Sequence, residues 1–427
     1  MARSRLSLRG LALTAVILTG LLTTCAAEPA PPPTPAPPPA TTPRAPGFGY
    51  QLAGYGLEDV MTGGRRGSTE LTDLPPGAPG ELVSSAEVPA PDGMRAWRMI
   101  YHSRGPLNED RLVTGLVIAP AGTSAIPAGG RRLISFGHGT TGINDSCAPS
   151  RAEPPLSAVG GVLPLVRAGN VLAITDYIGL GGPGEHPIYV ADTEGRALLD
   201  AARAAHSLSD ARAGRDVVLW GYSQGGQAAL AAGGLAASYA PDLRVHGAAA
   251  TAPLADLPTS LRLLDRTVPD GVAYVLLAAL GLAAADPTID LNAILTQTGR
   301  RLTAVARNQC AVGLLKASQG ESTSSVFTAD PFTTEPFAAG FARQWQQTRL
   351  PGPPELVLQG DLDTVIHRST TDGVVSGLCA NGGPVEYHRY GLADHGTILG
   401  VSMADLTSWI NARFVGTKPP GDICARP

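Results

Sequence analysis

Short apolar runs recur along the chain and alternate with longer stretches rich in alanine. The clearest runs are Arg132–Phe136, Asn170–Asp176, Asp216–Gly221 and Glu355–Gly360. Continuous apolar character is typical of parallel strands that helices cover on both faces. Alanine-rich stretches between some of the runs, such as Glu194–Leu208 and Gln227–Ser238, indicate such helices. The alternation predicts an α/β fold with a mostly parallel sheet and helices on both faces.

Two further patterns flank this sheet. Ala96–Ser103 and Arg111–Pro120 predict an antiparallel pair that leads into it. From about residue 256 to residue 339 the pattern becomes helical, with Val272–Ala285 and Leu291–Ala306 as the clearest helices. Such an insertion between strands is expected over the C-terminal edge of the sheet, where open α/β sheets bind ligands. The block therefore predicts a helical cap over a site, although a purely stabilising subdomain would look similar.

The N-terminus has the pattern of an export signal rather than of a folded element. Arginines precede the apolar stretch Leu11–Leu22, and small residues follow it. The proline-rich stretch Pro29–Pro46 cannot bury a core and predicts an extended tether. The predicted organisation is a signal peptide (1–27), a Pro-rich linker (28–50), a first part of the core (51–255), a helical cap (256–340) and a second part of the core (341–427).

Composition narrows the class of protein. The formal net charge is −4 and neither sign forms a long run, so we expect no nucleic-acid partner.

The chain has five cysteines. Cys25 ends a loosely lipobox-like sequence in which Thr24 stands where Gly, Ala or Ser is usual, so a lipid anchor is an alternative to free secretion. The other four cysteines predict two disulfides with three open connectivities in an exported chain. Without a CxxC or HExxH motif, we expect neither a metal nor a cofactor.

A nucleophile is predicted at Ser223. Gly221–Gly225 reads G-x-S-x-G and lies between a predicted strand and a predicted helix. This is the setting of a tight turn that exposes a serine hydroxyl at a helix N-terminus, where developing negative charge is favoured. The turn would leave no room for side chains at Gly221 and Gly225. A plain turn serine is the alternative interpretation.

A serine nucleophile requires a base and an acid that orients the base. In hydrolases with such a turn, the acid follows the serine in the chain and the base follows the acid. After Glu355–Gly360 the loop offers Asp361 and Asp363. Asp361 directly follows the turn glycine and suits a loop-shaping role. We therefore predict Asp363 as the acid and keep Asp361 as the reserve.

Three histidines follow that acid. His367 is close enough to begin the next helix, and His388 lies within an alternating run that predicts a strand. His395 lies in the loop after that strand, between residues that favour turns. A base in such a loop can reach the serine, so we predict His395 as the base.

Two donors are needed for the oxyanion of a tetrahedral intermediate. One should be the backbone N–H of Gln224, which follows the nucleophile, and the other should come from the loop after an earlier strand. That loop is Gly137–Gly142, in which Gly139 and Thr140 are the candidates, and the hydroxyl of Thr140 or Thr141 could add a donor. His138 lies in the same loop but precedes the acid, so we expect it to brace the loop.

These pieces together resemble the secretory lipase (LIP-type) family of α/β-hydrolases. The matching stretches are Gly137–Ser150 (GHGTTGINDSCAPS), Asp176–Pro187 (DYIGLGGPGEHP), Gly221–Gly226 (GYSQGG), Asp363–Ile366 (DTVI) and Ala393–Thr397 (ADHGT). The resemblance extends from about Tyr101 to the C-terminus, and α/β-hydrolases at large do not share the CAPS and DYxGLG motifs.

The resemblance implies an α/β-hydrolase fold with a triad of Ser223, Asp363 and His395 and a helical lid between sheet strands. It also implies two disulfides, Cys147–Cys310 and Cys379–Cys424. Fungal members have an acidic residue in the oxyanion loop, whereas this chain has Gly139 or Thr140 there. The family hydrolyses carboxylic esters, commonly acylglycerols.

The expected function is an exported serine carboxylester hydrolase, a triacylglycerol lipase or carboxylesterase that forms an acyl-enzyme. The alternatives are an acyltransferase with the same triad, a serine peptidase and a surface-tethered binding protein without catalysis. We expect a monomer that acts on an ester or lipid substrate and contacts a lipid interface through its cap. If the cap closes an acyl pocket, apolar residues such as Leu276 and Leu280 should line it.

Overall fold

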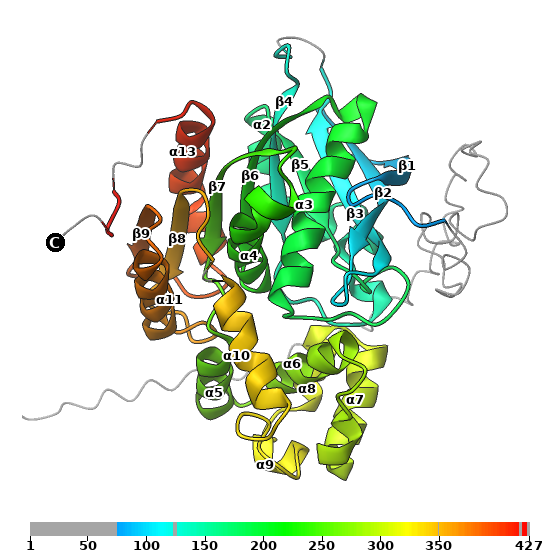
Figure 1. Ribbon diagram of the computed structural model, residues 1–427, viewed down its shortest axis with the longest axis vertical. Coiled ribbons are helices and arrows are strands. Elements are labelled where there is room, and N and C mark those ends of the chain that lie inside the picture. Colours follow the sequence, from blue (N-terminus) through cyan, green and yellow to red (C-terminus); the bar gives the residue numbers. More distant parts are fainter. Residues whose placement is uncertain (1–74, 123–125, 349, 418–420, 425–427) are drawn as a thin grey trace, which may run out of the picture. The chain divides into compact units, whose positions relative to one another are not determined.

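The computed structural model describes residues 75–122, 126–348, 350–417 and 421–424 (Figure 1). The predicted signal peptide, the Pro-rich linker and Cys25 lie outside these residues. Within the described ranges, no helix combines the length and the apolar character needed to cross a membrane.

Among the described residues, nine strands form one sheet in the order β1-β2-β3-β5-β4-β6-β7-β8-β9. The first three strands and β5 pair antiparallel, and all pairs from β5 to β9 are parallel. The mostly parallel sheet and the antiparallel β2–β3 pair are confirmed. The strands are β1 (Leu82–Val88), β2 (Met94–Arg104), β3 (Asp110–Pro120), β4 (Arg131–Gly137), β5 (Val171–Thr175), β6 (Ala213–Tyr222), β7 (Arg244–Thr251), β8 (Glu355–Gly360) and β9 (Val385–Tyr390).

Helices cover both faces of the sheet. Side chains of each central strand alternate between the faces, so a strand that is apolar throughout presents an apolar surface on both sides. In β6, Val217 and Leu219 pack with α3 (Ala191–Ser207) and α4 (Gln224–Tyr239). The neighbouring Val218 and Trp220 belong to the cluster on the other face. That cluster includes α2 (Leu163–Arg167) and α13 (Met403–Phe414). The sheet is therefore buried on both sides, as the apolar runs predict.

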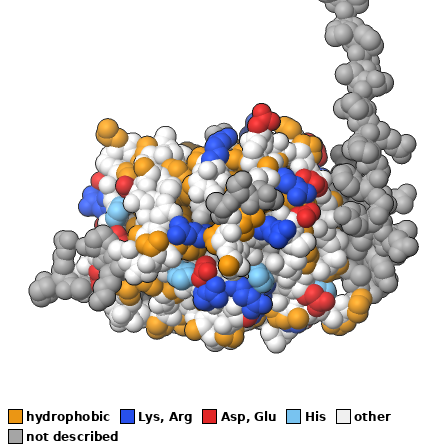
Figure 2. All heavy atoms as spheres, turned by 90° about the horizontal axis from the view of Figure 1, so that it is seen from above, with side chains coloured by type: hydrophobic (Ala, Val, Ile, Leu, Met, Phe, Trp, Pro, Cys, Tyr) orange, Lys and Arg blue, Asp and Glu red, His pale blue; other side chains and the backbone are white. Residues whose placement is uncertain are grey.

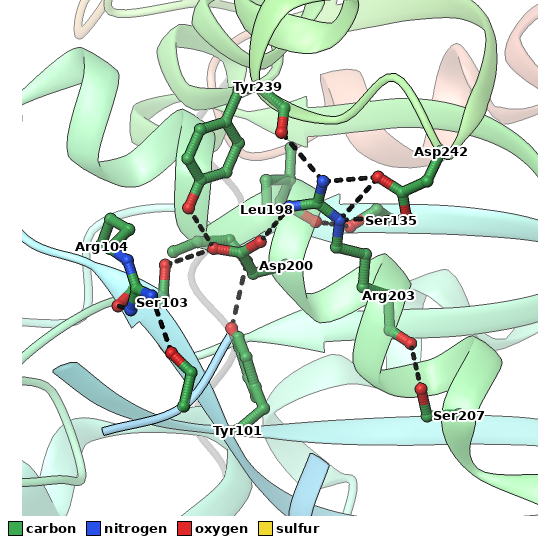
Figure 3. A network of polar contacts seen from close by, with 12 residues as sticks. Tyr101, Ser103, Arg104, Ser135, Leu198, Asp200, Arg203, Ser207, Tyr239 and Asp242 are labelled. Atoms are coloured by element: carbon green, nitrogen blue, oxygen red, sulfur yellow. Dashed lines mark hydrogen bonds and ion pairs between the residues drawn. The ribbon is translucent and has the colours of Figure 1, made fainter. Parts of the chain in front are cut away.

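A polar network fixes α3 against β2 and the end of α4 (Figure 3). Asp200 of α3 is fully buried and accepts hydrogen bonds from Ser103 Oγ at 2.7 Å and Tyr239 Oη at 2.7 Å. Arg203 pairs with Asp200 at 2.9 Å and also with Asp242. Because each buried polar atom of Asp200 has a partner, this network positions α3 along the sheet.

Figure 2 shows the molecule from above in the orientation of Figure 1, on the side away from the helices between β7 and β8. Basic and acidic side chains are interspersed among apolar ones on this face. At the N-terminal ends of β6 and β7, Arg244 pairs with Asp216 at 2.8 Å.

The segment between β7 and β8 is helical and lies at one end of the sheet (Figure 1). Its apolar cluster includes Ile188, Leu254 and Ile366, which lie in loops that follow strands of the core. This places the block at the C-terminal edge of the sheet. Its helices are α5 (Leu257–Thr267), α6 (Val272–Ala285), η6 (Leu291–Ile294), α7 (Gln297–Asn308), α8 (Ala311–Ala317), α9 (Thr323–Val326) and α10 (Phe337–Thr348).

One helix prediction in this block is wrong. The expected single helix Leu291–Ala306 is divided into η6 and α7. Leu295 pairs with Phe327 in an isolated antiparallel bridge, and the Thr296 hydroxyl accepts the Gly299 N–H at 3.1 Å. A threonine N-cap of this kind begins a new helix.

Two disulfides join distant parts of the chain, with the pairing that the family resemblance implies. Cys147–Cys310 connects the loop after β4 to the start of α8, with a Cα–Cα distance of 5.4 Å. Cys379–Cys424 connects α11 (Arg368–Ala380) to the C-terminal segment, with a Cα–Cα distance of 5.1 Å. Both distances lie within the usual range for a disulfide.

Candidate active site

Ser223 lies on a strained turn between β6 and α4. Its φ is 55° and its ψ is −115°, a conformation that non-glycine residues rarely adopt. The Ser223 N–H donates to the Thr251 carbonyl at 2.9 Å, which helps to hold the turn. A Cβ at Gly221 would overlap the Gly225 carbonyl, and one at Gly225 would overlap the Gly137 carbonyl. The predicted lack of space at both glycines is confirmed.

A hydrogen-bonded chain connects Ser223 to a histidine and an aspartate. His395 Nε2 lies 3.1 Å from Ser223 Oγ, and His395 Nδ1 lies 2.7 Å from Asp363 Oδ2. The second carboxylate oxygen of Asp363 accepts the N–H groups of Val365 at 2.9 Å and Ile366 at 2.7 Å. With 3% of its surface exposed, Asp363 is held as an acceptor toward the imidazole. The structure thus brings together the three residues that the sequence singles out.

The reserve residues lie elsewhere. Asp361 forms a two-pronged pair with Arg389, with both N–O distances at 2.9 Å. His367 is the N-cap residue of α11, and its Nε2 lies 3.2 Å from the Thr267 hydroxyl. His388 lies in β9 as expected, close to acidic side chains of that region. None of these three has a hydrogen bond to Ser223 among the contacts of the described residues.

The loop that carries His395 is fastened to the turn that carries the serine. Tyr222 Oη donates to the His395 carbonyl at 2.7 Å, and the two rings lie 5.0 Å apart. Within the same loop, the Asp394 side chain accepts the Thr397 N–H at 2.8 Å, across His395. These contacts restrict the position of the imidazole relative to Ser223.

Ser223 and His395 open into a pocket of about 320 Å³, near the lower end of the range for small-molecule sites. Its lining is largely apolar and includes hydroxyl groups and two imidazoles. Besides Ser223 and His395, the lining consists of Phe136, His138, Gly139, Thr140, Thr141, Pro149, Ala158, Val159, Gly161, Val162, Tyr222, Tyr274 and Leu399. Such a wall suits the apolar part of a small substrate.

The helical block contributes to this pocket differently from the prediction. Tyr274 is the residue of α6 that lines it. Leu276 is fully buried in the apolar cluster of the block, and Leu280 lines a separate cavity beside His186. The expectation that Leu276 and Leu280 line the pocket is therefore wrong, because α6 packs Leu276 into the interior of the cap and Leu280 lines the other cavity, next to the loop after β5.

The predicted oxyanion-site residues lie on both sides of Ser223. Gln224 begins α4, so its N–H is among the unpaired donors of a helix N-terminus. A Cβ at Gly139 would lie 3.6 Å from the Ser223 Cβ, which places the other loop next to the serine. The Thr140 hydroxyl shares a hydrogen bond with Tyr189 Oη at 2.8 Å. The two sides could bind a negatively charged oxygen between them.

His138 contacts its own loop and the loop after β5. Its Nδ1 lies 2.6 Å from the Gly139 carbonyl, and Tyr177 Oη donates to the His138 carbonyl at 2.9 Å. Burial lowers the pKa of His138. These contacts fit the bracing role that we expect from the sequence.

Sequence reasoning missed a buried glutamate beneath the turn. Glu194 in the first turn of α3 contacts the side chain of Gln224 and the backbone of Tyr189. The sequence pattern that could have revealed Glu194 is its position on one helix face with Ala197, Leu198 and Ala201, at spacings of three, four and seven residues. A glutamate on such an apolar face requires a partner.

Across the described ranges, no group of three or more His, Cys, Asp and Glu side chains is arranged to hold a metal ion. Ser223, His395 and Asp363 can together perform nucleophilic catalysis by a hydroxyl, assisted by a general base.

Comparison with known proteins decides the family. Residues 159–422, more than half of the chain, match the secretory lipase family. The chain belongs to the secretory lipase family. Membership of this family supports the assignment of the protein as a hydrolase of the lipase or esterase type, and it is consistent with an extracellular location.

Individual relatives are distant in sequence, but their alignments cover most of this chain. A "Probable inactive lipase" from Mycobacterium tuberculosis is 25% identical over 80% of this chain and 78% of that protein. Lipase A from Moesziomyces aphidis is 24% identical over 82% of this chain and 79% of that protein. The relatives thus include proteins named as lipases and one named as inactive.

Solved structures support the fold. Candida antarctica lipase A in its closed state matches with a TM-score of 0.70 and 20% identity, over 82% of this chain and 85% of that chain. The rice cell wall degrading esterase LipA from Xanthomonas oryzae matches with a TM-score of 0.64 and 18% identity, over 79% of this chain and 98% of that chain. The chain has the α/β-hydrolase fold.

Proposed function

We propose that this protein is an exported serine carboxylester hydrolase that cleaves acylglycerol-type esters through an acyl-enzyme. The observation that carries the proposal is the hydrogen-bonded chain from Ser223 Oγ through His395 to Asp363, at the mouth of an apolar pocket. An arrangement of nucleophile, base and orienting acid is the requirement for attack by a serine hydroxyl.

In the first half of the reaction, Ser223 Oγ attacks the ester carbonyl carbon and His395 Nε2 accepts the hydroxyl proton. Asp363 accepts the His395 Nδ1–H and stabilises the imidazolium. The carbonyl oxygen becomes an oxyanion, and in this proposal the Gln224 N–H and the Gly139–Thr140 loop supply its donors. The C–O bond then breaks, and the alcohol leaves with the proton from His395.

In the second half, water attacks the acyl-enzyme. His395 accepts a proton from the water, and the second tetrahedral intermediate collapses to release the carboxylic acid. Ser223 recovers its proton from His395, so the enzyme returns to its initial state. An alcohol in place of water would give acyl transfer by the same steps.

The pocket supports an ester with an apolar acyl group as the substrate. Val159 and Val162 of η4 (Ser157–Val162), Leu399 of α12 (Ile398–Val401) and Tyr274 form its apolar walls. Burial of each methylene against such walls contributes roughly 0.8 kcal/mol. The signal-like N-terminus and the two disulfides support export, because disulfides persist in oxidising compartments.

One relative is named as an inactive lipase, so the proposal needs a direct test. Purified protein is assayed on p-nitrophenyl butyrate, emulsified tributyrin and emulsified triolein, with and without an added alcohol as an acyl acceptor. We expect hydrolysis of at least the butyrate ester. No turnover on any ester, with or without the acceptor, would favour the non-catalytic alternative.

The matched variant is Ser223→Ala. We expect at least a ~1,000-fold loss in kcat, because removing the nucleophile leaves only the residual contribution of binding and the oxyanion site. The melting temperature should not fall, since alanine removes one hydroxyl. A variant with near-wild-type turnover on p-nitrophenyl butyrate would show that Ser223 is not the nucleophile.

A further inference from the structure

A single carboxyl oxygen near Ser223 accepts two hydrogen bonds from different segments of the chain. Glu194 Oε1 accepts the Gln224 side-chain N–H at 2.7 Å and the Tyr189 backbone N–H at 2.8 Å. Glu194, Gln224 and Tyr189 are each 1% exposed. In this dry environment both hydrogen bonds are stronger than they would be in water.

Each of these hydrogen bonds leads to one side of the oxyanion site. The first holds Gln224, the residue that offers the backbone N–H after the nucleophile. The second holds Tyr189, whose phenol shares a hydrogen bond with the Thr140 hydroxyl in the opposite loop at 2.8 Å. Tyr189 has a φ of 64°, a left-handed conformation that requires support from its surroundings.

We propose that Glu194 is a positioning residue that fixes the separation of the two oxyanion donors, by holding Gln224 directly and Thr140 through Tyr189. This inference rests on the proposed ester hydrolysis. Preorganised donors of this kind stabilise the transition state more than the bound substrate. Loss of Glu194 should therefore lower kcat and leave KM nearly unchanged.

The other features of Glu194 argue against a role in stability alone. Its Oε2 and the Gln224 Oε1 are buried without a hydrogen-bond partner. Burying such groups is unfavourable, and an apolar side chain would pack into the same space at less cost. Burial raises the pKa of Glu194 to about 8, so the carboxyl is neutral at pH 7. Glutamine reproduces this charge and keeps a carbonyl acceptor.

The experiment compares Glu194→Gln and Glu194→Met on p-nitrophenyl butyrate at pH 7. We expect Glu194→Gln to stay within about 3-fold of the wild-type kcat. Glu194→Met should lose about 10- to 100-fold in kcat with KM within about 3-fold, which is less than the ~100- to 1,000-fold effect of deleting a donor.

Glu355→Met is the matched control. Glu355 is the first residue of β8, at the opposite end of the strand from the Asp363 loop, and it is buried with Oε1 unpartnered. Burial raises its pKa to about 8 as well. Its substitution should change the melting temperature and leave kcat unchanged. The comparison distinguishes the effect of losing any buried carboxyl from the effect of losing the contacts that position the oxyanion donors.

Two further variants keep the inference testable if Glu194→Met does not fold. Gln224→Met removes the side-chain link but keeps the backbone donor, and Tyr189→Phe removes only the phenol oxygen. We expect each to lower kcat by about 3- to 30-fold. Gln224→Met combined with Glu194→Met should be less damaging than the product of the two single effects, because both remove the same contact.

The outcomes separate this inference from the proposed function. A wild-type enzyme without esterase activity would overturn both. An active wild type in which folded Glu194→Met, or both Gln224→Met and Tyr189→Phe, retain full kcat would overturn the role of Glu194 alone. Equal loss of kcat in Glu194→Met and Glu355→Met would also overturn it, because the effect would then be general destabilisation.

Discussion

At the residue scale, two aspartates of one loop have different surroundings. Asp363 is buried, accepts two backbone N–H groups and faces the His395 imidazole. Asp361 pairs with Arg389 at the surface, where the guanidinium holds the pKa of that carboxyl below its usual value. A surface pair of this kind contributes little to stability. The two positions therefore offer a matched test of the acid in the proposed mechanism.

We predict that Asp363→Asn lowers kcat by about 1,000- to 10,000-fold, because an amide at this position favours the wrong imidazole tautomer. Asp361→Asn should remain within about 3-fold of the wild type, since it alters only a surface pair. Steady-state kinetics on p-nitrophenyl butyrate measure both. Equal losses, or a larger loss for Asp361→Asn, would assign the orienting role to Asp361.

The sequence was sufficient to predict the residues around Ser223 whose order along the chain is typical of a fold with this turn. Ser223, Asp363 and His395 follow turn glycines or strand ends in the order that such hydrolases use. No comparable motif or chain order marks Glu194. Its partners Tyr189 and Gln224 become neighbours only when α3 and α4 pack side by side on the sheet.

At the element scale, strands were predicted where their side chains are large and apolar, and one central strand of small side chains was missed. The apolar runs of β4, β5, β6 and β8 are evident, whereas β7 was not predicted. Its last residues include Ala248, Ala249 and Ala250, which carry little strand preference. The fold requires small side chains there, because Gly233 of α4 approaches so closely that an added Cβ would lie 3.2 Å from the Ala248 Cβ.

The helix α6 gives a prediction of its own. Tyr274 lines the pocket, so Tyr274→Ala should enlarge it and raise the ratio of kcat/KM for octanoate over acetate esters. Leu276 is fully buried in the cap, so Leu276→Ala should lower the melting temperature, with a cost of about 2–5 kcal/mol, and affect all chain lengths equally. A chain-length ratio that moves with Leu276→Ala and not with Tyr274→Ala would contradict this assignment.

At the scale of the whole molecule, buried titratable groups link stability to pH. Burial raises the pKa of Glu194 and Glu355 to about 8 each and that of Asp200 to about 6. Burial lowers the pKa of His186 to about 3. Between pH 6.5 and pH 8 the folded state therefore keeps protons on the two glutamates that the unfolded chain has lost. The free energy of unfolding must fall as pH rises through this range.

We predict that the melting temperature falls between pH 6.5 and pH 9, with each glutamate contributing at most about 1.4 kcal/mol per pH unit. Below pH 6.5 the His186 contribution has the opposite sign, because the unfolded imidazole binds a proton that the folded one excludes. Calorimetry across the range measures the slope. Glu355→Gln should reduce it, and an unchanged slope in that variant would contradict the assignment to buried carboxyls.

The positions of the two disulfides divide the chain into covalent rings. The ring closed by Cys147 and Cys310 contains Ser223, and the ring closed by Cys379 and Cys424 contains His395. Asp363 lies in neither ring, on the backbone between them. A single backbone cut inside either ring leaves the resulting pieces joined by that bridge. A cut between Cys310 and Cys379 leaves Ser223 and His395 on pieces that neither bridge connects, so only non-covalent packing would then keep the hydroxyl and the imidazole together.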